Sequence, residues 1–123
     1  MATYQATDMH KLDLRILSLN ISGLRKKTNF LKHLIIKNKP DIVCLQETNI
    51  SENYFKNKAI YELGVEQNRC YFNFPNNKSN GTAIICISSC LRCENVAYYD
   101  EGRTIVLNMS QKSVKFTLIN IYA

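Results

Sequence analysis

The chain has 123 residues, of which 46% are hydrophobic, and it contains only four Gly and two Pro. This length predicts a single domain, and this composition excludes an intrinsically disordered protein. A formal net charge of +6 favours a polyanionic partner, nucleic acid before an anionic membrane, although a merely soluble basic protein has the same charge balance.

The N-terminal segment 1–10 is polar and has the pattern of neither a signal peptide nor a membrane anchor. No run approaches the ~20 apolar residues that a membrane-spanning helix needs. We therefore expect an intracellular protein, in the nucleus or the cytoplasm, that is not secreted and has no membrane partner.

The next segments predict a strand, a helix and a second strand. Apolar and polar residues alternate from Leu12 towards Asn20, which is typical of a strand. From Thr28 onwards apolar residues recur at helical spacing, which predicts a helix whose start Thr28 or Asn29 can cap and which stops at Pro40. The unbroken apolar run 42–45 predicts a strand buried on both faces of a sheet that helices cover. Such a βαβ unit almost always has a right-handed crossover and parallel strands.

A polar side chain stands at the end of each predicted strand. Glu47 follows the apolar run closely, and Asn20 ends the first strand. Parallel strands bring their carboxyl ends to one edge, where open α/β sheets bind ligands, and a carboxylate there can hold a hard divalent cation. Two plainer interpretations remain open: Glu47 as an exposed strand-end residue, and Asn20 as a turn former before Gly23.

The rest of the chain predicts mostly antiparallel structure. A weaker helical pattern covers Glu52 to Leu63, a strand covers Arg69 to Phe74, and a loop covers Pro75 to Gly81. Strands follow at Thr82 to Ile87, at about Asn95 to Tyr99 leading into Thr104 to Met109, and at Val114 to Tyr122. Turn residues between them stand at hairpin spacing, so a βαβ start gives way to an antiparallel meander in a mixed sheet.

The five cysteines predict no disulfide framework in a reducing compartment. Cys44 and Cys86 lie in apolar runs and are interpreted as small buried hydrophobes. Cys90 and Cys93 have redox or zinc spacing, but no second Cys or His pair lies nearby and no helix follows. We interpret them as a loop or strand-end pair.

Five segments of the chain carry a family resemblance: Ser18–Arg25, Pro40–Thr48, Gly81–Ile85, Glu101–Arg103 and Leu118–Ala123. In residues and order they resemble the endonuclease/exonuclease/phosphatase superfamily, and within it the endonuclease domain of LINE-type non-LTR retrotransposons. The resemblance implies a mixed-sheet α/β sandwich. Residues 12–123 would be its N-terminal half, truncated at the C-terminus, after a flexible tail at 1–11. Such a half-sandwich leaves one sheet face without its partner layer.

The resemblance also implies phosphodiester hydrolysis of DNA that depends on Mg²⁺ or Mn²⁺. Glu47 matches the metal-binding glutamate, and Asn20 matches the asparagine that helps to order the metal site. Tyr122 matches an active-site tyrosine that approaches the scissile phosphate, although an aromatic residue closing a strand is the plainer interpretation. Arg25 and Arg103 match basic positions assigned more weakly to phosphate contact or to structure.

The family's base and its terminal Asp-His pair would follow the last residue of this chain. We therefore expect the chain alone to be inactive. The missing C-terminal half, and a reverse transcriptase in the parent protein, are its expected partners besides DNA. Two alternatives remain open: a non-catalytic nucleic-acid-binding module, and a nonfunctional retroelement remnant.

Overall fold

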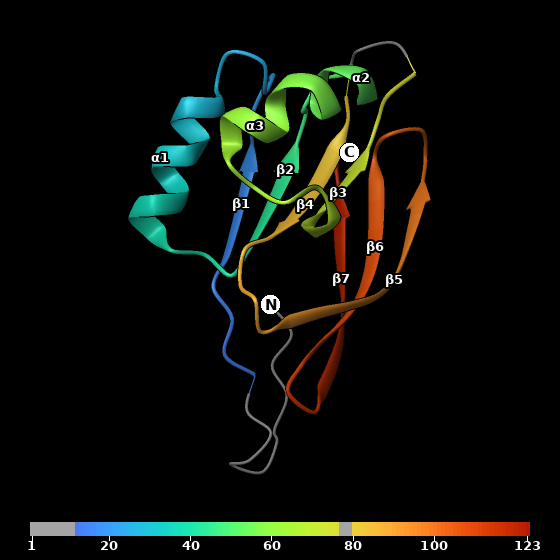
Figure 1. The fold of residues 1–123 in the computed structure, drawn as a ribbon. Coiled ribbons are helices and arrows are strands. Elements are labelled where there is room, and N and C mark those ends of the chain that lie inside the picture. Colours follow the sequence, from blue (N-terminus) through green and yellow to red (C-terminus); the bar gives the residue numbers. More distant parts are fainter. Residues whose placement is uncertain (1–11, 77–79) are drawn as a thin grey trace.

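Two β-sheets packed face to face, with helices over one of them, make up the fold (Figure 1). The computed structural model describes residues 12–76 and 80–123, so the expected tail at 1–11 and part of the loop at 75–81 lie outside the described residues. In chain order the elements are β1 (Ile16–Asn20), α1 (Thr28–Asn38), β2 (Ile42–Gln46), α2 (Glu52–Tyr54), η2 (Phe55–Ala59), α3 (Ile60–Leu63), η3 (Gln67–Arg69), β3 (Cys70–Asn73), β4 (Thr82–Cys86), β5 (Leu91–Tyr99), β6 (Thr104–Gln111) and β7 (Val114–Ile121).

The first sheet is mixed and has the strand order β1-β2-β4-β3. β1 and β2 pair in parallel, with Asn20 opposite Gln46, whereas β4 runs antiparallel to both of its neighbours. The predicted βαβ start and mixed sheet are thereby confirmed. Within the described ranges no helix has the length and apolarity needed to cross a membrane.

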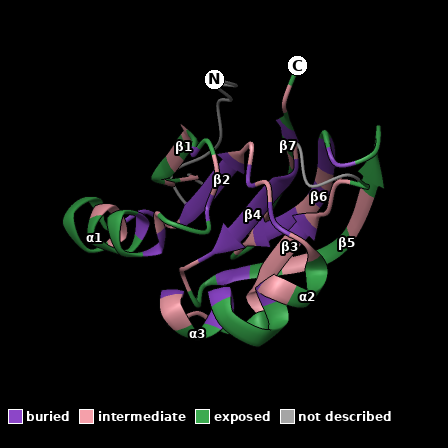
Figure 2. Cartoon of the chain, turned by 90° about the horizontal axis from the view of Figure 1, so that it is seen from above, coloured by how far each residue is buried: buried purple, intermediate pink, exposed green. Residues whose placement is uncertain are grey.

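The second sheet is the antiparallel meander β5-β6-β7. β5 begins at Leu91, earlier than the predicted start near Asn95. A bulge between Cys93 and Asn95 shifts the alternation of side chains by one residue, so the sequence pattern does not reveal the first part of the strand. The mixed pairing is confined to the first sheet, and the predicted meander forms a sheet of its own, as the expected α/β sandwich requires. That sheet packs on the first one, and Figure 2 shows β2 and β4 buried in the middle layer.

Two apolar clusters fill the spaces between the layers. Along β2, Val43 and Leu45 face the helices, whereas Ile42 and Cys44 face the second sheet. The apolar run is thus buried on both faces, as predicted, and burial raises the pKa of the Cys44 thiol to about 11. The uncovered face that the sequence predicted is the outer face of the meander, where Ile119 and Ile121 of the edge strand β7 are exposed.

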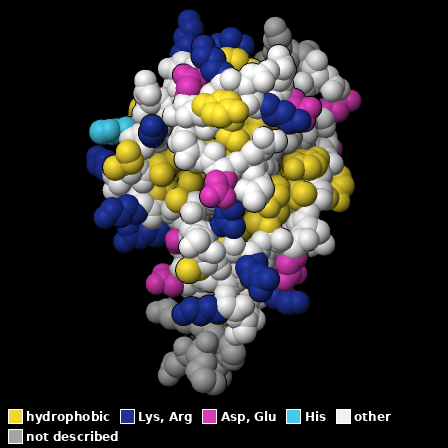
Figure 3. All heavy atoms as spheres, in the orientation of Figure 1, with side chains coloured by type: hydrophobic (Ala, Val, Ile, Leu, Met, Phe, Trp, Pro, Cys, Tyr) yellow, Lys and Arg dark blue, Asp and Glu magenta, His cyan; other side chains and the backbone are white. Residues whose placement is uncertain are grey.

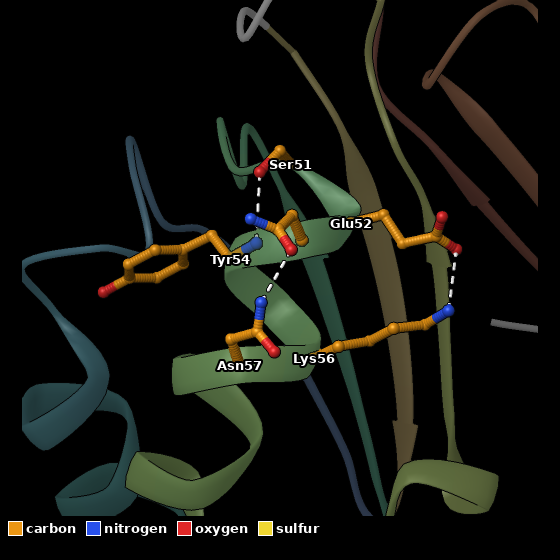
Figure 4. A network of polar contacts seen from close by, with 6 residues as sticks. Ser51, Glu52, Tyr54, Lys56 and Asn57 are labelled. Carbon is orange, nitrogen blue, oxygen red and sulfur yellow. Dashed lines mark hydrogen bonds and ion pairs between the residues drawn. The ribbon is translucent and has the colours of Figure 1, made fainter.

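The predicted helix from Glu52 to Leu63 has a wide turn in its middle. Ser51 Oγ accepts the backbone N–H of Tyr54 (3.1 Å) and caps the start, and Lys56 pairs with Glu52 (3.5 Å; Figure 4). The π-helical turn η2 then rotates Phe55 inward, where its ring centroid lies 4.3 Å from that of Phe72. The segment therefore anchors the helical layer on the first sheet.

A buried amide joins the two sheets. Asn120 of β7 is 4% exposed, and its Nδ2 donates to the carbonyls of Leu45 (3.0 Å) and Ala83 (2.8 Å) in the first sheet. Its Oδ1 accepts a hydrogen bond from Gln46 Nε2 (2.8 Å). Because the Leu45 and Ala83 residues and the Asn120 amide are withdrawn from water, loss of either bond to these two carbonyls removes a partner from a buried polar group.

We predict that Asn120→Ala lowers the free energy of unfolding by about 3 kcal/mol, since the substitution removes the side-chain donor from two buried carbonyls and one of the two acceptors of the Gln46 amide. Asn108→Ala is the matched control, because Asn108 also makes two side-chain hydrogen bonds, to Asn95 and Thr117, but at the surface. The free energy of unfolding of the Asn108→Ala variant is expected to fall by less than about 1 kcal/mol. Urea unfolding measures both values, and equal losses would contradict the role given to Asn120.

Candidate active site

The pairing of β1 with β2 continues beyond the last residue of each strand. The backbone N–H groups of Ile21, Gly23 and Leu24 donate in turn to the carbonyls of Gln46 (2.9 Å), Glu47 (2.8 Å) and Thr48 (2.9 Å). The loops after both strands are therefore held side by side at the upper end of the sheet in Figure 1. The structure thus brings Asn20 and Glu47 to one edge.

Two further loops extend this edge towards the second sheet. Thr48 and Asn49 donate their backbone N–H groups to the carbonyls of Gly81 (3.1 Å) and Asn80 (2.8 Å). Thr82 Oγ1 donates to the carbonyl of Gly102 (3.1 Å). We call the four connected segments 20–23, 47–49, 80–81 and 100–103 the rim loops.

Left-handed backbone conformations concentrate in the rim loops. Of the eight non-glycine residues with positive φ among those described, six lie there: Ser22, Glu47, Asn49, Asn80, Asp100 and Glu101. For Glu47, at φ +56°, this conformation costs about 1 kcal/mol, because a Cβ crowds the backbone. Backbone strain of this kind clusters at functional sites, where surrounding contacts impose it.

The Asn20 side chain orders the first rim loop. Its Oδ1 accepts hydrogen bonds from the backbone N–H (3.1 Å) and the hydroxyl (3.2 Å) of Ser22. This is the turn-forming arrangement that the sequence left open for Asn20. The same oxygen remains at the edge beside the loop of Glu47.

The second rim loop presents oxygen atoms without protein partners. Within the described ranges, no hydrogen bond or ion pair engages the half-buried Glu47 carboxylate, and Asn49 Oδ1 and Thr48 Oγ1 are buried without a hydrogen-bond partner. Asn49 is not among the site residues that the sequence predicted, and its one signal there is its position two residues after Glu47. Carboxylate and amide oxygens are hard ligands of the kind that Mg²⁺ and Mn²⁺ prefer.

These donors fit a hydrated metal ion better than a closed protein cage. The described residues contain no cluster of three or more His, Cys, Asp or Glu side chains that could enclose a metal. Mg²⁺ commonly keeps several waters and is held by one or two carboxylates together with substrate phosphates. The Glu47 carboxylate, with the amide oxygens of Asn20 and Asn49 in the same connected loops, offers ligands of that kind.

Tyr122 and Arg103 meet in a separate part of the edge. The Tyr122 backbone N–H donates to the Arg103 carbonyl (2.9 Å), which extends the meander's pairing past β7. Both residues line a cavity of about 790 Å³, together with Asn76, Asn80, Asp100, Glu101, Thr104, Ile121 and Ala123. Neither Asn20 nor Glu47 lines this cavity, so the structure does not bring all the predicted residues to one point. The loop that carries Glu47 meets the cavity lining where Asn49 contacts Asn80.

Arg25 lies on the other side of the rim loops. Its guanidinium carbon is 4.1 Å from the centroid of the Tyr54 ring, and the Tyr54 hydroxyl donates to the Arg25 carbonyl (3.5 Å). In Figure 4 the Tyr54 ring projects away from the Glu52–Lys56 pair, which leaves its face for this stacking. An exposed cation–π contact contributes about 0.5–1 kcal/mol, so Arg25 has a structural role in holding the first rim loop on α2.

The fold and its edge define a class, the α/β sandwiches with a polar rim at the strand ends. The sequence pattern described as Endonuclease/Exonuclease/phosphatase family matches residues 17–86, more than half of the chain. The chain belongs to the endonuclease/exonuclease/phosphatase family.

Individual relatives span more residues than this chain does. DNA-(apurinic or apyrimidinic site) endonuclease 2 of Xenopus laevis is 28% identical over 145 aligned positions, which cover 89% of this chain and 28% of that protein. The solved AP endonuclease of Archaeoglobus fulgidus has 25% identity and a TM-score of 0.67, covering 89% of this chain and 41% of the other. TDP2 of Caenorhabditis elegans has the same fold at 21% identity, with a TM-score of 0.70, covering 97% of this chain and 38% of the other. The chain thus spans less than half the length of each of these relatives.

We predict that Gly81→Ala disrupts the rim loops, because a Cβ at Gly81 would lie 2.3 Å from Thr48 Oγ1 in a backbone with φ +101°. Gly64→Ala is the matched control: Gly64 also has positive φ, at +70°, but nothing lies within 4 Å of the added Cβ. We expect the free energy of unfolding, measured with urea, to fall by about 1 kcal/mol in Gly64→Ala and by at least about 3 kcal/mol in Gly81→Ala. Similar losses would show that Gly81 and Thr48 are not packed together.

Proposed function

We propose that this chain is the N-terminal half, over residues 12–123, of a divalent-metal-dependent DNA endonuclease domain. The observation that carries the proposal is the strained rim, where the Glu47 carboxylate has no protein partner among the described residues and the connected loops carry the amide side chains of Asn20 and Asn49. Family membership supports hydrolysis of a phosphodiester, and similarity to a DNA-(apurinic or apyrimidinic site) endonuclease supports DNA as the substrate.

The proposed metal is Mg²⁺ or Mn²⁺. Glu47 would hold it directly, Asn20 would assist and order the loop, and Asn49 is an additional ligand candidate. A divalent cation in this position supplies charge stabilisation to phosphoryl oxygens and polarises a water molecule. Because the Glu47 backbone is left-handed, this residue does not continue the alternation of side chains along β2 and lies at the edge of the sheet.

The proposed phosphate contacts lie towards the second sheet. Tyr122 and Arg103 line a cavity that the rim-loop segments 80–81 and 100–103 help to form, and a phenol and a guanidinium can both bind phosphate oxygens. Arg25 is a weaker candidate, because its guanidinium already stacks on Tyr54. The net charge of +6 supports a DNA partner only as a total, because Figure 3 shows Lys and Arg side chains scattered over the visible face among Asp and Glu side chains rather than gathered in one patch.

The isolated chain is proposed to be inactive. Hydrolysis needs a base within hydrogen-bond reach of the attacking water. His33 lies on the exposed side of α1, away from the rim loops, and His10 lies outside the described residues. Losing several groups that act together removes essentially all turnover, even when the metal-binding residue remains.

The finer proposal is that the domain is of the retrotransposon type, with a reverse transcriptase in the parent protein. It rests on two segments of the resemblance, Glu101–Arg103 and Leu118–Ala123. Both segments lie at or beside the proposed phosphate cavity. Sequencing of the genomic DNA downstream of the Ala123 codon tests this proposal. A continuing frame with reverse-transcriptase signatures is the expected result, and a frame without them would contradict it.

We predict that Mn²⁺ selectively broadens the amide NMR signals of residues 20–23 and 47–49. Glu47→Gln should weaken this binding about tenfold or more, since it removes the only carboxylate proposed to hold the ion. Glu66→Gln is the matched control, because Glu66 is an exposed carboxylate outside the rim loops, and it should leave the broadening unchanged. Equal broadening in both variants would contradict the metal site.

The isolated chain is expected to bind double-stranded DNA weakly, with affinity that falls steeply as salt rises, and to leave supercoiled DNA intact in Mg²⁺. A gel assay for nicking and a binding titration at several salt concentrations measure the two properties. Nicking that Glu47→Gln abolishes would contradict the proposed inactivity. DNA binding that Glu47→Gln and Mg²⁺ leave unaffected would favour the alternative of a non-catalytic nucleic-acid-binding module.

A further inference from the structure

Two cysteines from facing sheets meet at the end of the sandwich that lies away from the rim loops. The Sγ atoms of Cys86, the last residue of β4, and Cys93, on β5, are 3.6 Å apart. Cys86 pairs with Ile42, the first residue of β2, whereas Glu47 follows the last residue of that strand. The cysteine pair and the candidate active site thus occupy opposite ends of β2.

An arginine fixes the crossover that brings the two cysteines together. The Arg69 guanidinium donates to the carbonyls of Cys86 (3.4 Å), Leu91 (3.1 Å) and Ser88. These carbonyls flank the connection between β4 and β5, so one side chain holds both ends of the crossover. The crossover is therefore fixed by hydrogen bonds, and it holds the two sulfur atoms in contact.

The spacing of Cys90 and Cys93 in the sequence suggests a different pair from the one that the fold forms. Cys90 is exposed on the turn before β5, where its backbone N–H donates to Ser88 Oγ (3.3 Å). Cys93 instead points into the sandwich, among the partly buried residues packed on the inter-sheet cluster. The residue across the sheets from it is Cys86.

A small reagent has access to the pair. Cys86 lines a cavity of about 360 Å³ together with Arg69 and Ser89, and Cys93 is only half-buried. Burial raises the pKa of the Cys86 thiol far above its usual value, and the Arg69 charge offsets part of this increase. The thiolate is thus scarce at neutral pH, and the pair should react slowly rather than as a fast sensor.

We propose that Cys86 and Cys93 form a reversible disulfide that joins the two sheets when the protein is exposed to a hydroperoxide. One thiolate attacks a peroxide oxygen: an S–O bond forms, the O–O bond breaks, and the leaving hydroxide takes a proton to become water. The other sulfur then attacks the sulfenic sulfur, an S–S bond forms, and a second water leaves. Two thiols lose two electrons and two protons in all, and one hydrogen peroxide becomes two waters.

The required movement is small. The two sulfurs close from 3.6 Å to the ~2.0 Å of a disulfide by side-chain rotation, with the Arg69-held crossover as a fixed frame. The bond would restrict the unfolded chain and tie the sheets at the end remote from the active site. A thiol such as dithiothreitol reverses it by exchange.

The test treats the full chain with hydrogen peroxide, blocks the remaining thiols and maps unreduced peptides by mass spectrometry. We expect the number of free thiols to fall from five to three, and the map to contain a linked Cys86–Cys93 peptide. The mass of the chain should fall by two hydrogen atoms, and its Tm should rise by several degrees. Dithiothreitol should return the Tm to its original value. Cys90→Ser should behave in the same way as the unsubstituted chain, whereas Cys93→Ser should lose both the link and the Tm shift.

Three results would overturn the proposal: a Cys90–Cys93 link in the unsubstituted chain, unchanged thiol loss in Cys93→Ser, or oxidation to sulfinic acid without any link. The peptide map of the unsubstituted chain decides the matter even if Cys93→Ser folds poorly. Mn²⁺ binding at the rim loops should be the same in both redox states, so this test and that of the metal site fail independently.

Discussion

The parallel pairing of β1 with β2 is the constraint on which the rest of the structure depends. It runs for the full length of both strands and continues through three backbone hydrogen bonds into the loops that follow. These bonds place Asn20 and Glu47 at one edge and force Glu47 into a left-handed conformation that its own side chain does not favour. The free energy of the paired, buried sheet offsets this local strain, so the candidate site is a consequence of the sheet's stability.

The buried amide of Asn120 connects this edge to the second sheet. By donating to the carbonyls of Leu45 and Ala83, it fixes β7 against β2 and β4 next to the residues that precede Glu47. Tyr122 follows two residues later and lines the neighbouring cavity. One polar contact inside an apolar layer thereby sets the position of the proposed phosphate-binding residues relative to the proposed metal-binding ones.

The sequence predicted the elements whose pattern is local and missed the features that depend on contacts between distant residues. The apolar run before Glu47 begins where β2 begins, and the helical spacing begins at Thr28, where α1 begins. Both patterns depend only on residues that are neighbours in the sequence. The sequence did not reveal the early start of β5, because the bulge after Cys93 interrupts the two-residue alternation of inward-facing and outward-facing side chains. The contacts of Asn120 and the unpaired oxygen of Asn49 arise from segments far apart in the chain, and nothing in their own neighbourhoods indicates them.

The most direct test of this account is the hydrogen bond from the Gly23 backbone N–H to the Glu47 carbonyl, since it joins the two loops that would share a metal ion. NMR couplings transmitted across hydrogen bonds can detect it in the isotope-labelled chain. We expect a coupling between the Gly23 amide nitrogen and the Glu47 carbonyl carbon, together with slow exchange of that amide with solvent. A Gly23 amide that exchanges at the rate of an unstructured peptide, with no such coupling, would contradict it.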